Sequence, residues 1–342
     1  MSAAVSLEYP FPEPPPPGET IEVLPGIGWL RMPLPFSLDH INLWLIEDAD
    51  GVFIVDCGIG DAATRSIWDD VLAATPRVRG VVVTHFHPDH IGNAEWLSRR
   101  FGVLPWIAQA EYLMSHASAT NSAGYTDAAT LDYFREHGLD DARRGALLAA
   151  RTGGYRKVVP ELPLHYQRLV AGESLSIADQ RWGILLGQGH SPEHVLFHQR
   201  GLGVLIAGDM VLPRISTNVS VHATQPFSNP LKLFLESLAS YRALPPDTLV
   251  LPSHGLPFRG LHARIAQLER HHEERLAELE AACVTARTAA EVMVTLFRRP
   301  LDGHQIWFAM GETLAHLNLL NEAGRLERST GEDGIVRFQR AA

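Results

Sequence analysis

The chain has 342 residues, of which 46% are apolar and 20% are charged. This balance is typical of folded globular proteins and excludes a disordered chain, and the length favours one large core with a smaller appended unit. The formal net charge is -10 at pH 7, which argues against a long non-specific contact with nucleic-acid phosphates unless basic residues cluster locally.

Cysteine usage and the N-terminal segment predict the compartment. Cys57 and Cys283 are too few for a disulfide framework and form no CxxC pair, so we expect buried free thiols. The first 20 residues contain no basic segment followed by an apolar one, and no run of about 18 apolar residues occurs in the chain. We therefore expect a cytoplasmic protein with no membrane segment.

Short apolar runs predict a large α/β domain over residues 1–258. These runs are typical of buried strands. They are INLWLI (41–46), GVFIVD (51–56), GVVVTH (80–85), WGILLGQGH (182–190), GVLIAGD (203–209) and TLVLPSH (248–254). Between them, residues from about 105 to 166 show helical stretches and few strand patterns, which indicates a helical insertion.

The C-terminal part begins with a predicted long amphipathic helix. Residues 260–283 are rich in helix formers and have leucines at near-helical spacing, so residues 259–285 are expected to form a linker helix. His271 and His272 lie in it among charged neighbours, which favours a solvated face. Residues 286–342 read as three helical pieces, one before Pro300 and two around QIWFAM and ETLAHLNLLNEA, followed by a hairpin, an arrangement typical of a winged-helix-like domain.

The charge of this tail argues against a nucleic-acid partner. Residues 286–342 contain seven arginines against seven acidic residues, so the tail has no net charge and no basic stripe. A packing role or a homodimer contact is favoured for the winged-helix-like domain. The expected partner of the whole chain is a small-molecule substrate.

Nearly every predicted strand ends in a histidine or an aspartate. These residues are Asp56, His85, His190, Asp209 and His254. The carboxyl ends of strands are where α/β proteins assemble their sites. Five such residues, each at the end of a predicted strand, therefore indicate one shared site. Imidazole and carboxylate are metal-ligand groups.

The segment THFHPDHIGN is the most specific motif. His85 and His87 are two residues apart in an extended stretch and can face one metal ion, whereas Pro88 turns the chain so that Asp89 and His90 can face a second. A helix is expected to start near Asn93. An HxHxDH pattern is much more specific for metal binding than an isolated HxH pair.

Over about residues 20–258, the chain resembles the metallo-β-lactamase superfamily, whose hallmark is this HxHxDH box. The resemblance implies an αββα sandwich with two metal ions. It assigns His85, His87 and His190 to the first metal, Asp89, His90 and His254 to the second, and Asp209 to a bridge between them. Hydrolases of this family with a C-terminal domain of this kind form a recognisable subgroup, which the architecture resembles along its full length.

The presence of Asp209 places the resemblance in the hydrolytic branch typified by glyoxalase II and not among antibiotic-destroying members, which lack the bridging carboxylate. Two divalent cations lower the pKa of a shared water towards about 7, so a metal-bridging hydroxide is available as the nucleophile. Asp89 can accept a proton, and Asp56 is placed to orient a ligand or the water. Zn²⁺ suits the donors best, and Fe or Mn also fits them.

The favoured function is a metal-dependent hydrolase of a small acyl substrate such as a thioester or lactone. The alternative is a metal-dependent phosphodiesterase or ribonuclease, which the same chemistry permits but the acidic composition disfavours. A regulator that keeps its metals only for structure is a third, weaker hypothesis. Redox chemistry is not expected, because the chain has no flavin domain.

Other histidines and aromatic residues could in principle bind a metal ion or a substrate, but a structural role is favoured for the histidines. His194, His198, His222 and His304 lack ligand spacing. His40 begins a strand that could approach the metal site, but a core or edge histidine is the favoured interpretation. Aromatic side chains in the insertion could form a substrate lid, although ordinary packing explains them equally well. They are Tyr112, Tyr125, Tyr133, Phe134 and Tyr155.

Overall fold

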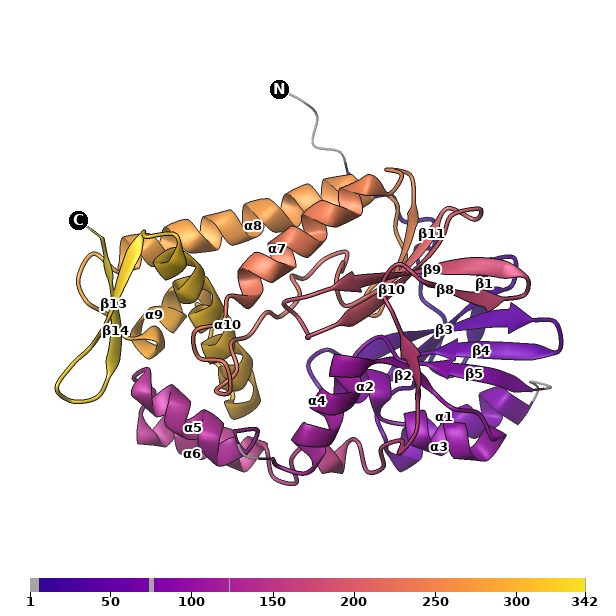
Figure 1. Cartoon of the computed structure of the whole chain (residues 1–342), viewed down its shortest axis with the longest axis horizontal. Helices are drawn as coiled ribbons and strands as arrows, with labels where there is room; N and C mark the ends of the chain where they lie inside the picture. The colour runs from indigo at the N-terminus through magenta and orange to yellow at the C-terminus, as the bar shows by residue number, and fades with distance from the viewer. Residues whose placement is uncertain (1–5, 74–76, 123, 342) are drawn as a thin grey trace. The chain divides into compact units, whose positions relative to one another are not determined.

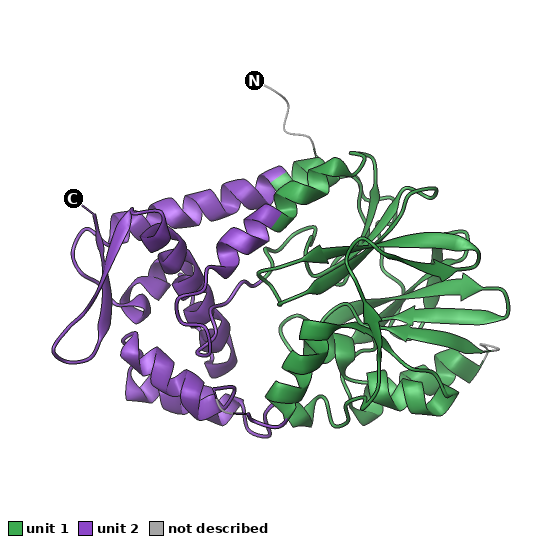
Figure 2. Ribbon diagram, viewed as in Figure 1, with its two compact units in different colours: residues 1–119, 155–217, 237–265 green, residues 120–154, 218–236, 266–342 purple. Residues whose placement is uncertain are grey.

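The computed structural model describes residues 6–73, 77–122 and 124–341 (Figure 1). The chain divides into two compact units, each assembled from three separate stretches (Figure 2). Unit 1 contains residues 1–119, 155–217 and 237–265, and unit 2 contains residues 120–154, 218–236 and 266–342. The predicted domains are continuous segments that end at residues 258 and 285, whereas each unit combines separate stretches. The predicted domain boundaries therefore stay predictions.

Unit 1 is built on two β-sheets, one of seven strands in the order β1 to β7 and one of five in the order β12-β11-β10-β9-β8. Strands β4 to β7 run parallel, as do β11 and β12, whereas the other pairs are antiparallel. The first sheet contains β1 (Thr20–Leu24), β2 (Ile27–Pro33), β3 (His40–Asp48), β4 (Gly51–Val55), β5 (Val78–Val82), β6 (Trp106–Ala108) and β7 (Gln167–Leu169). The second contains β8 (Ser174–Ile177), β9 (Gln180–Gly187), β10 (His194–Gln199), β11 (Val204–Gly208) and β12 (Leu249–Pro252).

A single apolar core lies between the two sheets. Trp29 and Trp44 from the first sheet are fully buried and stack with ring centroids 6.1 Å apart. They belong to the same cluster as Trp182 and Phe197 from the second sheet. Alternating side chains along each strand supply this inner face, so the sheets are held together mainly by burial of large apolar surfaces.

Helices cover the outer faces of the sheets. On the first sheet these are α1 (Ala62–Ala73), α2 (Pro88–Ile91), α3 (Ala94–Phe101) and α4 (Gln109–Ala119). Trp68 of α1 packs into the cluster beneath that sheet, and its indole N–H donates to the carbonyl of Cys57 at 2.9 Å. Along the second sheet run the end of α7 (Pro230–Ser240) and the start of α8 (Leu261–Ala282) (Figure 1).

The predicted strands are confirmed, but their ends differ from the prediction. Strand β5 ends at Val82, so His85 lies three residues beyond the strand in a loop. The helix expected near Asn93 is divided into α2, which begins at Pro88, and α3, whose N-cap is Asn93. Pro88 can occupy the first turn of a helix because its missing N–H has no intrahelical partner there.

Unit 2 is largely helical. It contains α5 (Asp127–Glu136), α6 (Asp141–Ala150), α9 (Ala289–Leu296), α10 (Gly303–Glu322) and the hairpin of β13 (Leu326–Thr330) and β14 (Val336–Arg340). The hairpin was predicted, but the two helical pieces expected around QIWFAM and ETLAHLNLLNEA are one continuous helix, α10. Gly311 lies inside it, where a Cβ would come within 2.6 Å of the Ser220 hydroxyl. This glycine permits a close contact and does not end the helix.

The predicted linker helix is present as α8, but the prediction that His272 lies on a solvated face is wrong. Its side chain is fully buried, with its ring 5.7 Å from that of Phe234 and its Nδ1 3.1 Å from Nε2 of His316. The charged neighbours of His272 lie on other faces of the helix, so local composition concealed its burial. Cys57 and Cys283 are buried free thiols, as predicted.

Within the described residues, no helix has both the length and the apolar character needed to cross a bilayer.

Candidate metal centre

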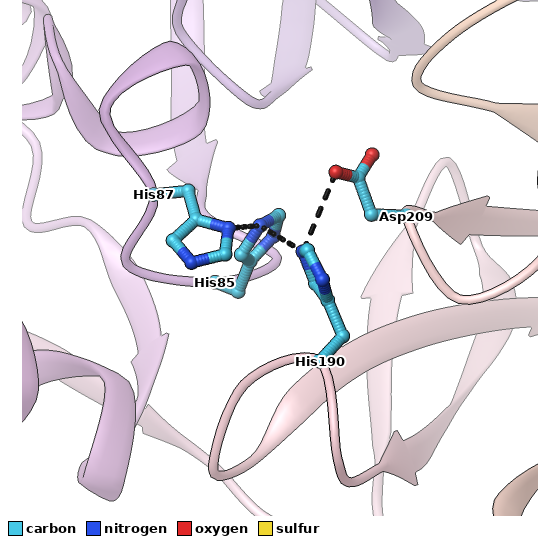
Figure 3. Close-up of side chains that lie close together, drawn as sticks. All are labelled: His85, His87, His190 and Asp209. Carbon is cyan, nitrogen blue, oxygen red and sulfur yellow. Dashed lines mark hydrogen bonds and ion pairs between the residues drawn. The ribbon is translucent and has the colours of Figure 1, made fainter. Parts of the chain in front are cut away.

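Three histidine nitrogens converge at one point in unit 1. Nε2 of His85 lies 2.9 Å from Nδ1 of His87 and 3.1 Å from Nε2 of His190 (Figure 3). His85 and His87 come from the loop after β5, and His190 comes from the loop after β9. Burial lowers the pKa of His85 well below its ordinary value, so this ring is neutral and offers a lone pair.

A second group contains Asp89, His90 and His254. Nε2 of His90 lies 3.6 Å from Asp89 Oδ2, and Nε2 of His254 lies 3.5 Å from the same oxygen. Both histidines are buried, whereas the Asp89 side chain is 19% exposed. Burial opposes protonation of His90, but Asp56, Asp89 and Asp209 outweigh it and raise the pKa of this ring well above its ordinary value. The negative charge of the surrounding carboxylates therefore dominates the electrostatics around His90.

Asp209 faces both groups with a different oxygen. Oδ2 lies 3.4 Å from Nε2 of His190, and Oδ1 lies 3.4 Å from Nε2 of His254. Asp209 directly follows β11 and His254 follows β12 closely, and these strands are parallel neighbours. The ladder between them therefore sets the distance between the two side chains.

The donor set fits two metal ions. One candidate group consists of His85, His87, His190 and Asp209, and the other of Asp89, His90 and His254, with ligand atoms within 4.8 Å of one another in each. A tetrahedral zinc ion sets neighbouring ligand atoms about 3.3 Å apart, close to the separations observed. In addition, Nε2 of His90 and Oδ1 of Asp209 are buried and make no hydrogen bond within the described residues. Such buried polar atoms require a partner, which a cation would supply.

Asp56 holds the second group in place. Its carboxylate accepts from the Thr84 backbone N–H at 2.8 Å, the Thr84 hydroxyl at 2.9 Å and Nδ1 of His90 at 2.8 Å. Because the Nδ1–H of His90 is used in this way, Nε2 is left free to face the cluster. Asp56 is in the left-handed backbone region with φ of +63° and is fully buried.

His254 is oriented by a backbone group. Its Nδ1–H donates to the carbonyl of His40 at 2.7 Å, while Nε2 of His40 accepts the Gly255 N–H at 2.9 Å. His40 is therefore a hydrogen-bonded histidine at the start of β3 and also contacts a candidate metal ligand. Asn42 adds hydrogen bonds to the carbonyls of Pro252 and Gly255, so β3 fixes the His254 loop from two positions.

His194 orients Asp209 by accepting a hydrogen bond from its backbone. Its Nε2 accepts the Asp209 backbone N–H at 3.0 Å, and its ring stacks on His85 with centroids 4.5 Å apart. Burial lowers the pKa of His194 well below its usual value, so it remains a neutral acceptor. Gly208 permits this approach, because a Cβ at that position would lie 2.2 Å from the imidazole carbon Cε1. The structural role expected for His194 is therefore confirmed.

Glu111 in α4 is a residue that the sequence analysis missed. Its fully buried carboxylate accepts from the Phe86 N–H at 2.9 Å, the Ser191 hydroxyl at 2.7 Å and the Glu193 N–H at 2.6 Å. These donors lie in the two loops that carry His85, His87 and His190, so Glu111 ties the loops together. Burial raises the pKa of Glu111 to about 7.

Four of the five aromatic side chains singled out in the insertion are buried or make specific contacts, and a role as a substrate lid stays a prediction. Tyr112 stacks on Tyr166 with centroids 4.1 Å apart, and the Tyr155 hydroxyl donates to the Phe86 carbonyl at 2.5 Å. Tyr133 and Phe134 are buried in unit 2. Neither candidate ligand group includes His198, His222 or His304, as expected.

Comparisons with known proteins agree with this geometry. Residues 37–254 match the family model of the metallo-beta-lactamase superfamily, and residues 276–341 match that of the metallo-beta-lactamase-like C-terminal domain. A solved beta-lactamase domain protein from Burkholderia ambifaria is 48% identical with a TM-score of 0.91, and 98% of each chain is covered.

Two curated bacterial relatives are more distant. The probable metallo-hydrolase YqjP of Bacillus subtilis (strain 168) is 25% identical, covering 91% of this chain and 96% of its own. A hydroxyacylglutathione hydrolase of Thiobacillus denitrificans is 27% identical, covering 82% of this chain and 89% of its own. The family match, the fold and the His/Asp cluster together show that this chain belongs to the metallo-beta-lactamase superfamily and is a metallo-hydrolase.

Proposed function

We propose that the protein hydrolyses a small acyl substrate, a thioester or a lactone, with two Zn²⁺ ions as cofactors. The observation that carries the proposal is Asp209, whose two oxygens face the two ligand groups separately. A carboxylate in this position can bridge two cations. Bound there, the cations would activate a water molecule and polarise the substrate carbonyl.

The side chains of the site divide the remaining tasks. His85, His87 and His190 would hold one cation, and Asp89, His90 and His254 the other, with Asp209 shared. Asp89 is the most exposed of the four ligands Asp89, His90, Asp209 and His254, at 19% against 0 to 11% for the others. It is therefore the ligand best placed to accept a proton from the attacking water and return it to the leaving group. Asp56 acts through His90, which it orients.

Zinc is favoured by the donors. The groups combine five imidazoles with two carboxylates, a borderline set that zinc accepts without a geometric preference of its own. Protein loaded with zinc, iron or manganese and then dialysed would be analysed for retained metal. Retention of about two zinc ions per chain supports the proposal, whereas retention of iron or manganese in preference to zinc contradicts the metal assignment.

A thioester is the first substrate to test, because a curated relative is named for the hydrolysis of hydroxyacylglutathione, which is a thioester. The metal-loaded protein would be assayed against acyl thioesters, lactones and bis(p-nitrophenyl) phosphate. Asp89→Ala should reduce acyl turnover at least about 100-fold, because it removes a ligand and a proton acceptor. Asp70→Ala is the matched control, since Asp70 is an exposed aspartate on helix α1.

The assay gives different results for an acyl hydrolase and for a phosphodiesterase. Turnover of a thioester or lactone that is lost in Asp89→Ala and kept in Asp70→Ala supports the proposal. Cleavage of the phosphodiester alone would replace it with phosphodiesterase activity.

A further inference from the structure

A cavity of about 370 Å³ in unit 1 has His254 in its wall. It lies between the β2–β3 loop, the segment after Asp209 and the N-terminal arm. The lining residues are Pro12, Pro14, Arg31, Leu38, His40, Pro213, Arg214, Ile215, His254, Gly255 and Leu256. One of these residues, His254, is a candidate metal ligand, so the cavity borders the candidate centre.

The charge in the cavity wall is positive. The wall contains two arginines and no acidic residue. Arg31 is offset by Asp39, whose Oδ1 lies 3.6 Å from the guanidinium. Arg214 is exposed, and within the described residues it has no ion-pair partner. A guanidinium without an ion-pair partner therefore lies in the same cavity wall as His254, in a chain whose net charge is -10.

The loop that carries Arg214 is held from beneath. The buried guanidinium of Arg264, in the first turn of α8, donates to the carbonyl of Leu212 at 2.6 Å and to that of Ile215 at 2.8 Å. These two carbonyls flank Arg214 on either side. These contacts hold the backbone on both sides of Arg214, so less backbone freedom is lost when the side chain binds a ligand.

The rest of the wall is apolar. Leu38, Ile215 and Leu256 line the cavity together with three prolines, and Ile215 is 48% exposed. An exposed apolar side chain next to an unpaired guanidinium suits a ligand with an apolar part and an anionic end.

We propose that Arg214 is a specificity-determining residue that binds a carboxylate or phosphate of the substrate while the acyl group lies at the metal centre. This inference rests on the proposed acyl hydrolase function and narrows it to anionic acyl compounds. A guanidinium can donate two parallel hydrogen bonds to either anion. The anion can belong to the acyl part or to the thiol part, and both carry the same recognition chemistry.

The first test compares three acyl thioesters on the zinc-loaded protein. S-acetyl-N-acetylcysteamine is neutral, S-acetylglutathione carries carboxylates on the thiol part, and S-glutaryl-N-acetylcysteamine carries one on the acyl part. Arg214→Ala should lower kcat/KM for at least one anionic thioester about 10- to 100-fold, with less than about a 2-fold change for the neutral one. Which anionic thioester loses turnover identifies the part of the substrate that reaches Arg214.

The matched control is Arg168→Ala. Arg168 is an exposed arginine on β7 that does not line the cavity, and it too has no ion-pair partner within the described residues. This variant should leave all three values unchanged. Arg214→Lys should recover part of the lost turnover, because it restores the charge without the paired donors.

A second measurement does not depend on turnover. Binding of the uncleavable thioethers S-propylglutathione, S-(3-carboxypropyl)-N-acetylcysteamine and neutral S-propyl-N-acetylcysteamine would be measured by calorimetry on the wild type and on Arg214→Ala. A rise in Kd of about 10-fold or more for a charged thioether alone, together with weaker wild-type binding of it at high salt, supports the inference. Equal changes for charged and neutral thioethers, or no change at all, overturn it. Should the wild type hydrolyse no thioester or lactone, the proposed function fails, and the thioether binding still decides the role of Arg214.

Discussion

Two clusters of buried histidines occupy the two units, and they differ in what accompanies the imidazoles. In unit 1, five histidines meet Asp89 and Asp209. In unit 2, His272 and His316 meet each other, with Nδ1 of His272 3.1 Å from Nε2 of His316. The Nδ1–H of His316 donates to the carbonyl of Glu312 at 2.8 Å, so both nitrogens of that ring are already used by the protein.

The comparison of the two clusters shows which features allow buried histidines to bind a metal ion. In the candidate centre, His90 and His254 use Nδ1 for orientation and keep Nε2 for the cluster. Carboxylates also matter, because they offset the charge of the cations. Within the described residues, the pair in unit 2 belongs to no group of three or more ligand atoms, and of its four ring nitrogens only Nε2 of His272 lacks a hydrogen bond. Burial lowers the pKa of His272 to about 3 and that of His316 to about 4.

The largest expected effect comes from removing the shared carboxylate. Asp209→Ala should lower acyl hydrolysis at least about 1,000-fold and reduce bound zinc below one ion per chain, since both groups lose a ligand. His316→Ala should keep two zinc ions. Metal analysis and kcat/KM measured on both variants check this contrast, and an Asp209→Ala protein that keeps two ions would disprove the bridging role.

A smaller effect is expected from loosening a ligand without removing it. Asp56→Asn keeps the shape of the side chain but weakens the acceptor of the Nδ1–H of His90. Partners of this kind typically change metal affinity about 10- to 100-fold. A competition titration with a zinc chelator would measure the affinity, while the circular dichroism spectrum should stay unchanged. Unaltered affinity would mean that the orientation of His90 does not depend on Asp56.

The smallest effect concerns acid stability of the pair in unit 2. Because the folded-state pKa of both rings is lowered, the folded chain binds fewer protons than the unfolded chain below pH 6.5. The stability that the two neutral rings contribute is complete above pH 6.5. It is lost as the pH falls towards their folded-state pKa values of about 4 and about 3. In metal-free protein, lowering the pH from 7.5 to 5.5 should cost on the order of 1 kcal/mol per ring.

Urea unfolding of His272→Gln/His316→Gln should show this loss to be absent, although the double variant is less stable at both pH values. His165→Gln, which alters an exposed histidine, should keep the pH dependence of the wild type. Equal pH dependence in the double variant and the wild type would show that the two rings are not responsible.

The side chains of the candidate metal centre could be brought together from sequence because they follow apolar runs that read as strands, and α/β proteins assemble their sites at the carboxyl ends of strands. Asp209 and His254 are 45 positions apart in the chain, yet their strands are parallel neighbours. Glu111 could not be predicted in this way. It lies in a helix and its carboxylate binds backbone N–H groups, which have no side-chain pattern in the sequence.

Errors elsewhere have the same cause, namely that tertiary contacts override local pattern. His272 was assigned to a solvated face because of its charged neighbours, but Phe234 and His316 surround its ring. Two helical pieces were predicted where α10 is one helix, and Gly311 inside it permits the close contact with Ser220. Phe234, His316 and Ser220 all lie far along the chain from the residues that they contact. A local sequence pattern could therefore not predict these contacts.

The candidate ligands come from both sheets of unit 1, and this has a consequence for biosynthesis. The HxHxDH segment follows β5 of the first sheet, whereas His190, Asp209 and His254 follow strands of the second. During translation, the early segment emerges long before residue 254, so a cation captured then would be held by an incomplete coordination sphere. Full coordination therefore waits until the second sheet has closed over the first, and metal uptake by refolding protein would report the moment of that closure.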